Sequence, residues 1–312
     1  MSISSYPSGF RGGALIKGVP VHDAIDGNIF WVDSVAGGAG NPGSYLRPVA
    51  TIEQAVNLST GSNHDRIFVK AGHAETIANA TDLVADKAGI TITGMGRGTS
   101  RPTLTFSAAA SSIVVSAADV TFENFIMTAN FADVAEAFTP TAKRLTVRDV
   151  VFNNGGTNLN WVELADTSTT DNEADGLTFE RCHLFEIDTA ATSVVNVDAD
   201  IDQLTIKDCY VDLGVNGVLS SLVEVAAGKD TTRIQLEGNY MSRLVAASAV
   251  QIITWADTTT TNTGIIRNND SRSLDVAGEL LATAGSNVHF VENYTTSAID
   301  KSGYASLPAV DS

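Results

Sequence analysis

A six-residue apolar pattern recurs seven times between residues 120 and 293. Its third position is apolar in every copy, and successive third positions are 25, 32, 27, 30, 30 and 24 residues apart. These positions are Phe122, Val147, Phe179, Ile206, Leu236, Ile266 and Phe290. Self-similarity at a period of about 20 to 50 residues indicates a solenoid, in which each repeat packs against its neighbours. The chain is therefore expected to form one long body with extended side walls.

Further short apolar stretches lie within each repeat. A second stretch begins 14 to 16 residues after the first column, as at 161–164, 194–197 and 222–225. Two earlier members of the series are expected at Ile67–Val69 and Ile90–Ile92, with Val69 and Ile92 aligned to Phe122. Two or three short strands per turn, joined by loops of variable length, predict an all-β parallel β-helix over residues 29–295.

The two ends of the chain differ from this body. Residues 1–28 are interrupted by Gly, Pro and Ser and are expected to form an extended arm. A short amphipathic helix is predicted near residues 50–59, because Thr51 and Gln54 have capping-box spacing. This helix would cover the first open turn of the solenoid. Residues 296–312 are polar and are expected to form a C-terminal tail or cap.

Charge and hydropathy narrow the possible partners. The formal net charge of −17 argues against nucleic-acid binding. No stretch is long and apolar enough to suggest a membrane span, and the N-terminus lacks the pattern of a secretory signal. Residues 1–22 nevertheless contain Arg11 and Lys17 and no acidic residue, so the arm is basic relative to the acidic remainder.

The sixth position of the repeat changes character along the chain. It is apolar at first, then cysteine, and finally asparagine: Phe125, Val150, Cys182, Cys209, Asn239, Asn269 and Asn293. The asparagines are predicted to form an internal hydrogen-bonded ladder between successive turns. The two cysteines would lie on adjacent turns, where a disulfide is geometrically possible, but two buried thiols are the favoured interpretation.

The residues offer few groups for catalysis. Asp198, Asp200 and Asp202 alternate along a possible strand and are a candidate Ca²⁺ site, although an acidic turn would explain the same residues. His73 and Glu75 are close in sequence, but no nucleophile accompanies them, so a structural role is expected. None of the motifs GxSxG, HExxH and CxxC occurs, and no cofactor is predicted.

The N-terminal third resembles a known group of proteins. Ile29–Asp33, the glycine-rich loop 37–43, Ala50–Ile52 and Arg66–Gly72 together resemble the start of pectate-lyase-like right-handed β-helix domains. Within that group, the arm with Tyr6–Phe10, together with Gly94–Gly98, is similar to β-helix proteins of tailed-phage virions. The resemblance covers residues 6–130 by motif and the remainder by repeat pattern.

The resemblance implies a structural virion protein rather than an enzyme. It would decorate the capsid exterior, after synthesis in the host cytoplasm, as a homotrimer bound to the major capsid protein. The arm would make the attachment, with five candidate contact residues: Tyr6, Phe10, Arg11, Leu15 and Lys17. The alternatives are a tailspike-like polysaccharide lyase or hydrolase, and a non-catalytic adhesin that binds a host surface glycan.

Overall fold

The computed structural model describes residues 27–156, 158–167, 170–185, 192–212, 221–243, 251–256, 261–273 and 287–296. It also describes the backbone of three short strands, β1 (Leu15–Ile16), β2 (Val19–Pro20) and β31 (Tyr304–Ala305). The side chains of the arm and most of the C-terminal tail lie outside the described residues. The five arm candidates therefore remain predictions.

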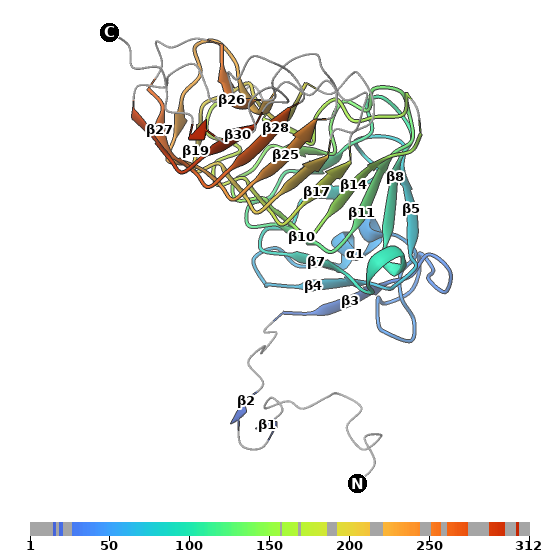
Figure 1. Ribbon diagram of the computed structural model, residues 1–312. Coiled ribbons are helices and arrows are strands. Elements are labelled where there is room, and N and C mark those ends of the chain that lie inside the picture. Colours follow the sequence, from blue (N-terminus) through green and yellow to red (C-terminus); the bar gives the residue numbers. More distant parts are fainter. Residues whose placement is uncertain are drawn as a thin grey trace.

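The body is a parallel β-helix with three sheets that run along its length (Figure 1). Sheet 1 contains β3 (Ile29–Val32), β4 (Arg66–Val69), β7 (Thr91–Gly94), β10 (Thr121–Glu123), β13 (Thr146–Arg148), β16 (Thr178–Glu180), β20 (Thr205–Lys207), β24 (Ile234–Glu237), β27 (Thr263–Arg267) and β29 (Asn287–Val291). Sheet 2 contains β5 (Ala74–Ile77), β8 (Thr103–Phe106), β11 (Ile126–Ala129), β14 (Val151–Asn154), β17 (His183–Phe185), β21 (Tyr210–Asp212), β25 (Tyr240–Arg243), β28 (Asp270–Ser273), β30 (Tyr294–Thr296) and β31. Sheet 3 contains β6 (Val84–Ala85), β9 (Ile113–Val115), β12 (Phe138–Pro140), β15 (Ala165–Asp166), β18 (Ser193–Val197), β22 (Ser221–Val225) and β26 (Gln251–Trp255). A further small sheet pairs β19 (Ile201–Asp202) with β23 (Thr231–Thr232).

The aligned third positions of the sequence repeat are register partners in sheet 1. Phe122 pairs with Val147, and the column continues in register through to Phe290. These side chains are buried, apart from Phe290, which is partly buried against the core. The predicted alignment of Ile92 with Phe122 is confirmed. The alignment of Val69 was wrong by two residues, because Ile67 pairs with Ile92.

A left-handed residue links sheet 1 to sheet 2 in each of these repeats. The backbone has positive φ at Asn124, Asp149, Arg181, Asp208, Gly238, Asn268 and Glu292. Asn, Asp and Gly tolerate this conformation best, and they occupy five of the seven positions. The next residue is the sixth position of the repeat, whose side chain enters the core. The connection therefore has a constant length, and the variation in repeat length falls elsewhere in each turn.

The predicted asparagine ladder is confirmed. Asn239 Nδ2 donates to Asn269 Oδ1, and Asn269 Nδ2 donates to Asn293 Oδ1, both at 2.9 Å. Each asparagine also donates to the carbonyl of the third-position residue in the preceding turn, as Asn269 Nδ2 does to Leu236 O at 2.9 Å. The ladder thus satisfies backbone groups at a turn where the chain changes sheet.

The two cysteines perform the same task with a weaker donor. Cys182 and Cys209 are free and buried. Their thiols donate to Val147 O at 3.5 Å and to Phe179 O at 3.7 Å, again the third-position carbonyl of the preceding turn. The favoured interpretation of buried thiols agrees with this arrangement, and the hydrogen bonds give them a structural role.

The cap helix α1 (Ile52–Leu58) lies at the end of the body that begins with β3, as predicted. Thr51 Oγ1 accepts the Gln54 N–H at 3.3 Å, and Gln54 Oε1 accepts the Ala50 N–H at 2.9 Å. Its Ile52, Ala55 and Val56 side chains are buried. No helix in the described part of the chain is long and apolar enough to cross a membrane.

Candidate functional site

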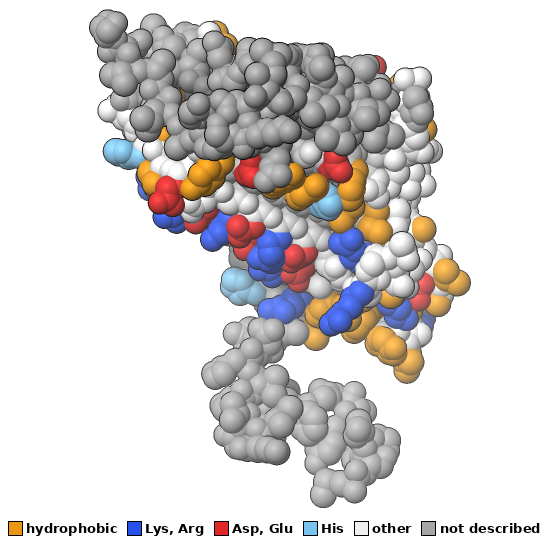
Figure 2. Space-filling view, viewed as in Figure 1, with side chains coloured by type: hydrophobic (Ala, Val, Ile, Leu, Met, Phe, Trp, Pro, Cys, Tyr) orange, Lys and Arg blue, Asp and Glu red, His pale blue; other side chains and the backbone are white. Residues whose placement is uncertain are grey.

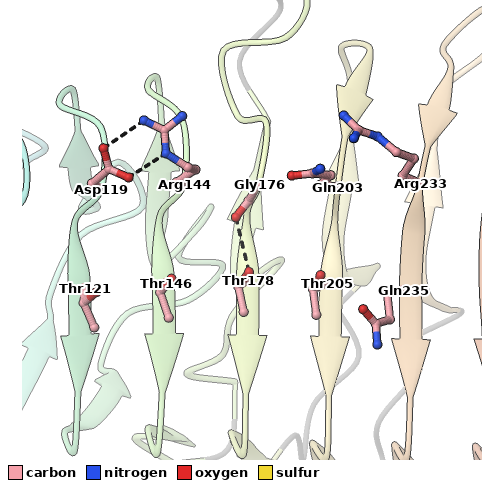
Figure 3. Close-up of a pocket in the computed structure, with 10 residues that line it drawn as sticks. All are labelled: Asp119, Thr121, Arg144, Thr146, Gly176, Thr178, Gln203, Thr205, Arg233 and Gln235. Carbon is pink, nitrogen blue, oxygen red and sulfur yellow. Dashed lines mark hydrogen bonds and ion pairs between the residues drawn. The ribbon is translucent and has the colours of Figure 1, made fainter.

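A groove runs across the outer face of sheet 1 (Figure 3). It has a volume of about 640 Å³ and crosses strands β10, β13, β16, β20 and β24. These five strands span about 19 Å, at about 4.8 Å for each step between neighbours. The groove is lined by Asp119, Thr121, Arg144, Thr146, Gly176, Thr178, Gln203, Thr205, Arg233 and Gln235.

The floor of the groove is a row of hydroxyl groups. Thr121, Thr146, Thr178 and Thr205 are register partners on consecutive strands, and Gln235 continues the row. Figure 3 shows the four threonine side chains at the same height on their strands. Threonine suits this position because its branched side chain packs well on a half-buried sheet surface. The row offers hydrogen-bonding groups but no charge.

Ion pairs form the wall where the strands begin. Arg144 donates two hydrogen bonds to Asp119, from Nε to Oδ1 at 2.5 Å and from Nη2 to Oδ2 at 2.8 Å (Figure 3). Arg233 Nε donates to Asp202 Oδ1 at 2.7 Å. In each pair the hydrogen bond from the guanidinium lowers the pKa of the carboxyl below its usual value. Both carboxylates are therefore ionised and engaged at neutral pH.

Gly176 lies next to Arg144 in the same row of residues and has no side chain. Its φ is +78°, and a Cβ there would lie 2.8 Å from Arg144 Cγ. A side chain at this position would therefore press against the stem of Arg144. The glycine therefore leaves room for the Arg144 side chain that binds Asp119.

A second groove of about 380 Å³ lies at the other end of the strands, between sheets 1 and 2. Here Arg181 binds Asp149 through two hydrogen bonds of 2.8 Å, and the bond from Arg181 lowers the pKa of Asp149. Arg148 Nε donates to Glu123 Oε2 at 2.6 Å. The carboxylates of Glu123 and Asp149, which line this groove, are thus also bound to arginines.

A ladder of alternating charge runs beside the threonine row. Acidic and basic residues alternate in register along six strands of sheet 1, and Figure 2 shows blue and red side chains alternating in a band along the body. The six residues are Glu123, Arg148, Glu180, Lys207, Glu237 and Arg267. Opposite charges on neighbouring strands favour this register over a slipped one.

Two of the three aspartates proposed as a Ca²⁺ site, Asp200 and Asp202, have separate partners. β18 ends at Val197 and β19 begins at Ile201, so Asp198 and Asp200 lie in a turn and not on one strand face. Asp202 is bound by Arg233, whereas Asp200 Oδ1 accepts the Asp230 N–H at 2.9 Å. Among the described residues, no three His, Cys, Asp or Glu side chains are grouped as a metal site requires.

His73 and Glu75 form a buried pair. His73 Nε2 lies 2.9 Å from Glu75 Oε2, which also accepts the Ile52 N–H at 3.0 Å at the start of α1. The pair thus joins strand β5 to the cap helix, in keeping with the structural role that was expected. Trp161 and Trp255 are buried core residues.

The sequence did not single out an acidic cluster on sheet 3. Glu136 and Glu163 occupy the same position on adjacent turns, because Phe138 pairs with Ala165 and Glu163 N–H donates to Ala135 O. Burial, together with repulsion from neighbouring carboxylates, raises the pKa of Glu163 to about 7. The pKa of Asp166 is raised to about 7 for the same reasons, and burial also raises the pKa of Glu136. Val134 and Trp161 are paired across the two turns and are 27 residues apart, as are Glu136 and Glu163. An alignment of these two apolar residues would therefore have placed the two glutamates side by side.

Comparisons with known proteins identify no family. No protein-family model matches the chain, and no curated protein sequence matches it. A rhamnogalacturonan lyase structure is 10% identical with a TM-score of 0.44, over 91% of this chain and 90% of that one. A GH136 lacto-N-biosidase from Eubacterium ramulus is 9% identical with a TM-score of 0.38, over 86% of this chain and 68% of that one. Identities of 9–10% assign no substrate or catalytic residue to this chain.

Proposed function

We propose that the chain is a structural β-helical protein of a tailed-phage virion, bound to the capsid exterior through its N-terminal arm. It would stabilise the shell or present a surface to the host. One observation carries the proposal furthest: the carboxylates that line the two grooves of sheet 1 are bound to arginines. The resemblance of residues 6–130 to phage virion proteins is what suggests a capsid location for this proposal.

The paired carboxylates favour a scaffold because glycan hydrolysis needs a different arrangement. It requires two carboxyl groups that face the substrate, one of them protonated to act as a general acid. Asp119 and Asp149 have lowered pKa values and are held by Arg144 and Arg181. In this state they tie neighbouring turns together instead of donating protons. A rigid wall of this kind suits a protein that serves as a spacer or a platform.

The arm is tested by binding to purified capsid shells that lack this protein. Removal of residues 1–22 is expected to abolish co-sedimentation with the shells and to leave the β-sheet circular dichroism signal intact. Arg11→Glu in the full chain should weaken binding, whereas the control Arg97→Glu, an exposed arginine on the body, should not. Normal decoration by the truncated chain would refute attachment through the arm.

The acidic cluster on sheet 3 favours a second candidate function, hydrolysis of a host glycan. Glu136 and Glu163 lie on adjacent turns, so their backbones are about 4.8 Å apart. Side chains stacked at that spacing would bring their carboxyl groups near the roughly 5 Å that separates the two carboxyl groups of retaining glycosidases. A carboxyl with a pKa of about 7, as at Glu163, is suited to act as the general acid.

This candidate is tested by release of reducing ends from host surface polysaccharide. Activity should disappear in Glu163→Gln and in Glu136→Gln, and should persist in the control Glu224→Gln, which changes the same residue type on strand β22 of sheet 3. Loss of activity on joint substitution of Asp198, Asp200 and Asp202, with Glu163→Gln fully active, would instead favour the aspartate turn. No release by the unaltered chain would dismiss hydrolysis of that polysaccharide.

A further inference from the structure

The end of the body that begins with β3 exposes a set of large apolar side chains. Val35 is 90% exposed, Leu46 is 87% exposed and Tyr45 is 59% exposed. Ile29 and Leu58 are also exposed, and Figure 2 shows hydrophobic side chains gathered at this end of the body. We refer to Ile29, Trp31, Val35, Tyr45, Leu46 and Leu58 as the apolar end. Monomeric proteins rarely expose large apolar patches that have no function.

Short contacts join Tyr45 of the apolar end to Trp31 and to Lys70. The Tyr45 ring packs edge-on against Trp31, with ring centroids 4.9 Å apart. Lys70 Nζ lies 4.7 Å from the centre of the Tyr45 ring and 3.3 Å from Asp33 Oδ2, two residues before Val35. The charge of Lys70 is thus paired, and it brings the loop of Val35 close to the loop of Tyr45.

Hydrogen bonds hold both loops in place before any partner binds. Asp33 Oδ1 accepts the Val35 N–H at 2.9 Å, and Asn41 Nδ2 donates to Pro48 O at 2.8 Å. The turn that carries Leu46 is closed by the Arg47 N–H, which donates to Ser44 O at 3.0 Å. A surface that is ordered in advance loses little conformational entropy when it is buried.

The distribution of charge indicates which partner suits this end. Up to Arg101 the sequence contains eight Lys and Arg residues and eight Asp and Glu residues, so the whole formal charge of −17 belongs to residues 102–312. Two copies of the chain therefore repel each other along most of their length. At the apolar end they meet without net charge, and apolar, aromatic-rich surfaces with few charges are typical of interfaces between identical subunits.

We propose that the apolar end is a self-association surface that joins copies of this chain at their N-terminal ends. The acidic bodies would then diverge from the contact. The arms begin at the same end, so an oligomer would present several arms side by side and gain avidity for a repeated surface. The proposal does not depend on the virion assignment, since it concerns only the chain itself.

The test is sedimentation equilibrium of the full-length chain between 1 and 100 μM, roughly the range of moderate affinities. The unaltered chain is expected to associate reversibly. Leu46→Ser and Val35→Ser should each weaken association about 10- to 100-fold, the effect of losing one buried apolar side chain. Phe131→Ser is the matched control, because Phe131 is 42% exposed but lies on the acidic part of the body.

Salt provides an independent readout. Added salt screens repulsion between the acidic bodies, so association should strengthen from 50 to 500 mM NaCl (a range of about 14 to 4 Å in screening length). A chain that is monomeric at every concentration and salt level overturns the proposal. Association that weakens with salt, or that Phe131→Ser disrupts as much as Leu46→Ser does, also overturns it.

Discussion

Asn269 lies in the middle of the asparagine ladder, and Asn269→Ala should remove four hydrogen bonds at once. Its Oδ1 accepts from the Asn239 N–H at 3.0 Å and from Asn239 Nδ2 at 2.9 Å. Its Nδ2 donates to Leu236 O and to Asn293 Oδ1, both at 2.9 Å. The side chain is buried, so water cannot replace these partners without opening the turn.

The expected loss of stability follows from these contacts. A hydrogen bond contributes about 1 kcal/mol net, and a buried group left without a partner costs about 1–3 kcal/mol. Four lost bonds, partly compensated by relaxation, should lower the free energy of unfolding by about 3–5 kcal/mol. Because a solenoid is stabilised by contacts between neighbouring turns, the turns next to residue 269 should open first.

The measurement combines urea denaturation followed by circular dichroism with hydrogen exchange of peptides covering 234–243 and 263–273. The control is Asn57→Ala, which makes the same chemical change at an exposed position of α1. Asn57→Ala should lower stability by less than about 1 kcal/mol. Equal effects of the two substitutions, or unchanged exchange in both peptides, would refute the conclusion that the asparagine ladder stabilises neighbouring turns.

Three further outcomes are expected. Cys209→Asn should be tolerated or raise the unfolding midpoint in urea, since an amide donates to Phe179 O better than a thiol, whereas Cys209→Val should lower the midpoint. Burial alone would raise the pKa of Asp65, but its hydrogen bonds, from the Thr60 N–H among others, outweigh burial and lower it. Asp65 therefore stabilises the fold above about pH 4, and acid titration should show that stability lost as the pH falls further, with Asp65→Asn about 2–3 kcal/mol less stable at pH 7. The raised pKa of Glu163 has the opposite sign: stability falls as the pH rises from about 4.5 to about 7, so Glu163→Gln should gain about 1–2 kcal/mol at pH 8 and nothing at pH 4. Thermal denaturation at both pH values would contradict this if the gain were the same at each.

The sequence predicted those parts of the fold that repeat at constant geometry. The third and sixth positions are joined by a left-handed residue and a turn of fixed length, so a simple alignment of the repeats found both columns. The same alignment failed at Ile67 and Val69, because both are buried apolar residues of one strand and periodicity cannot choose between them. At that point the cap helix also interrupts the repeat.

The candidate sites were harder to predict for two physical reasons. Strands β12 and β15 of sheet 3 have only three and two residues and follow loops of different lengths, so the step that places Glu136 beside Glu163 is not shared by the other turns of this sheet. Whether a carboxylate is free to bind a metal or a substrate also depends on its partners in space. Asp198 and Asp202 are close in sequence, yet the ionised carboxylate of Asp202 is bound by Arg233, which is 31 residues away along the chain.

The residues at the sixth position hold neighbouring turns of the β-helix together by two different kinds of interaction. Near the N-terminal end Phe125 and Val150 hold the turns together by packing, whereas Asn239, Asn269 and Asn293 hold the later turns through identical hydrogen bonds. Because the hydrogen bonds are equivalent, a whole turn between two asparagines could be removed or duplicated. The asparagines on either side of the change would still form the same hydrogen bonds with each other. The later half of the chain can therefore change its length in whole turns, while the earlier half, where each core contact is different, fixes one end of the rod.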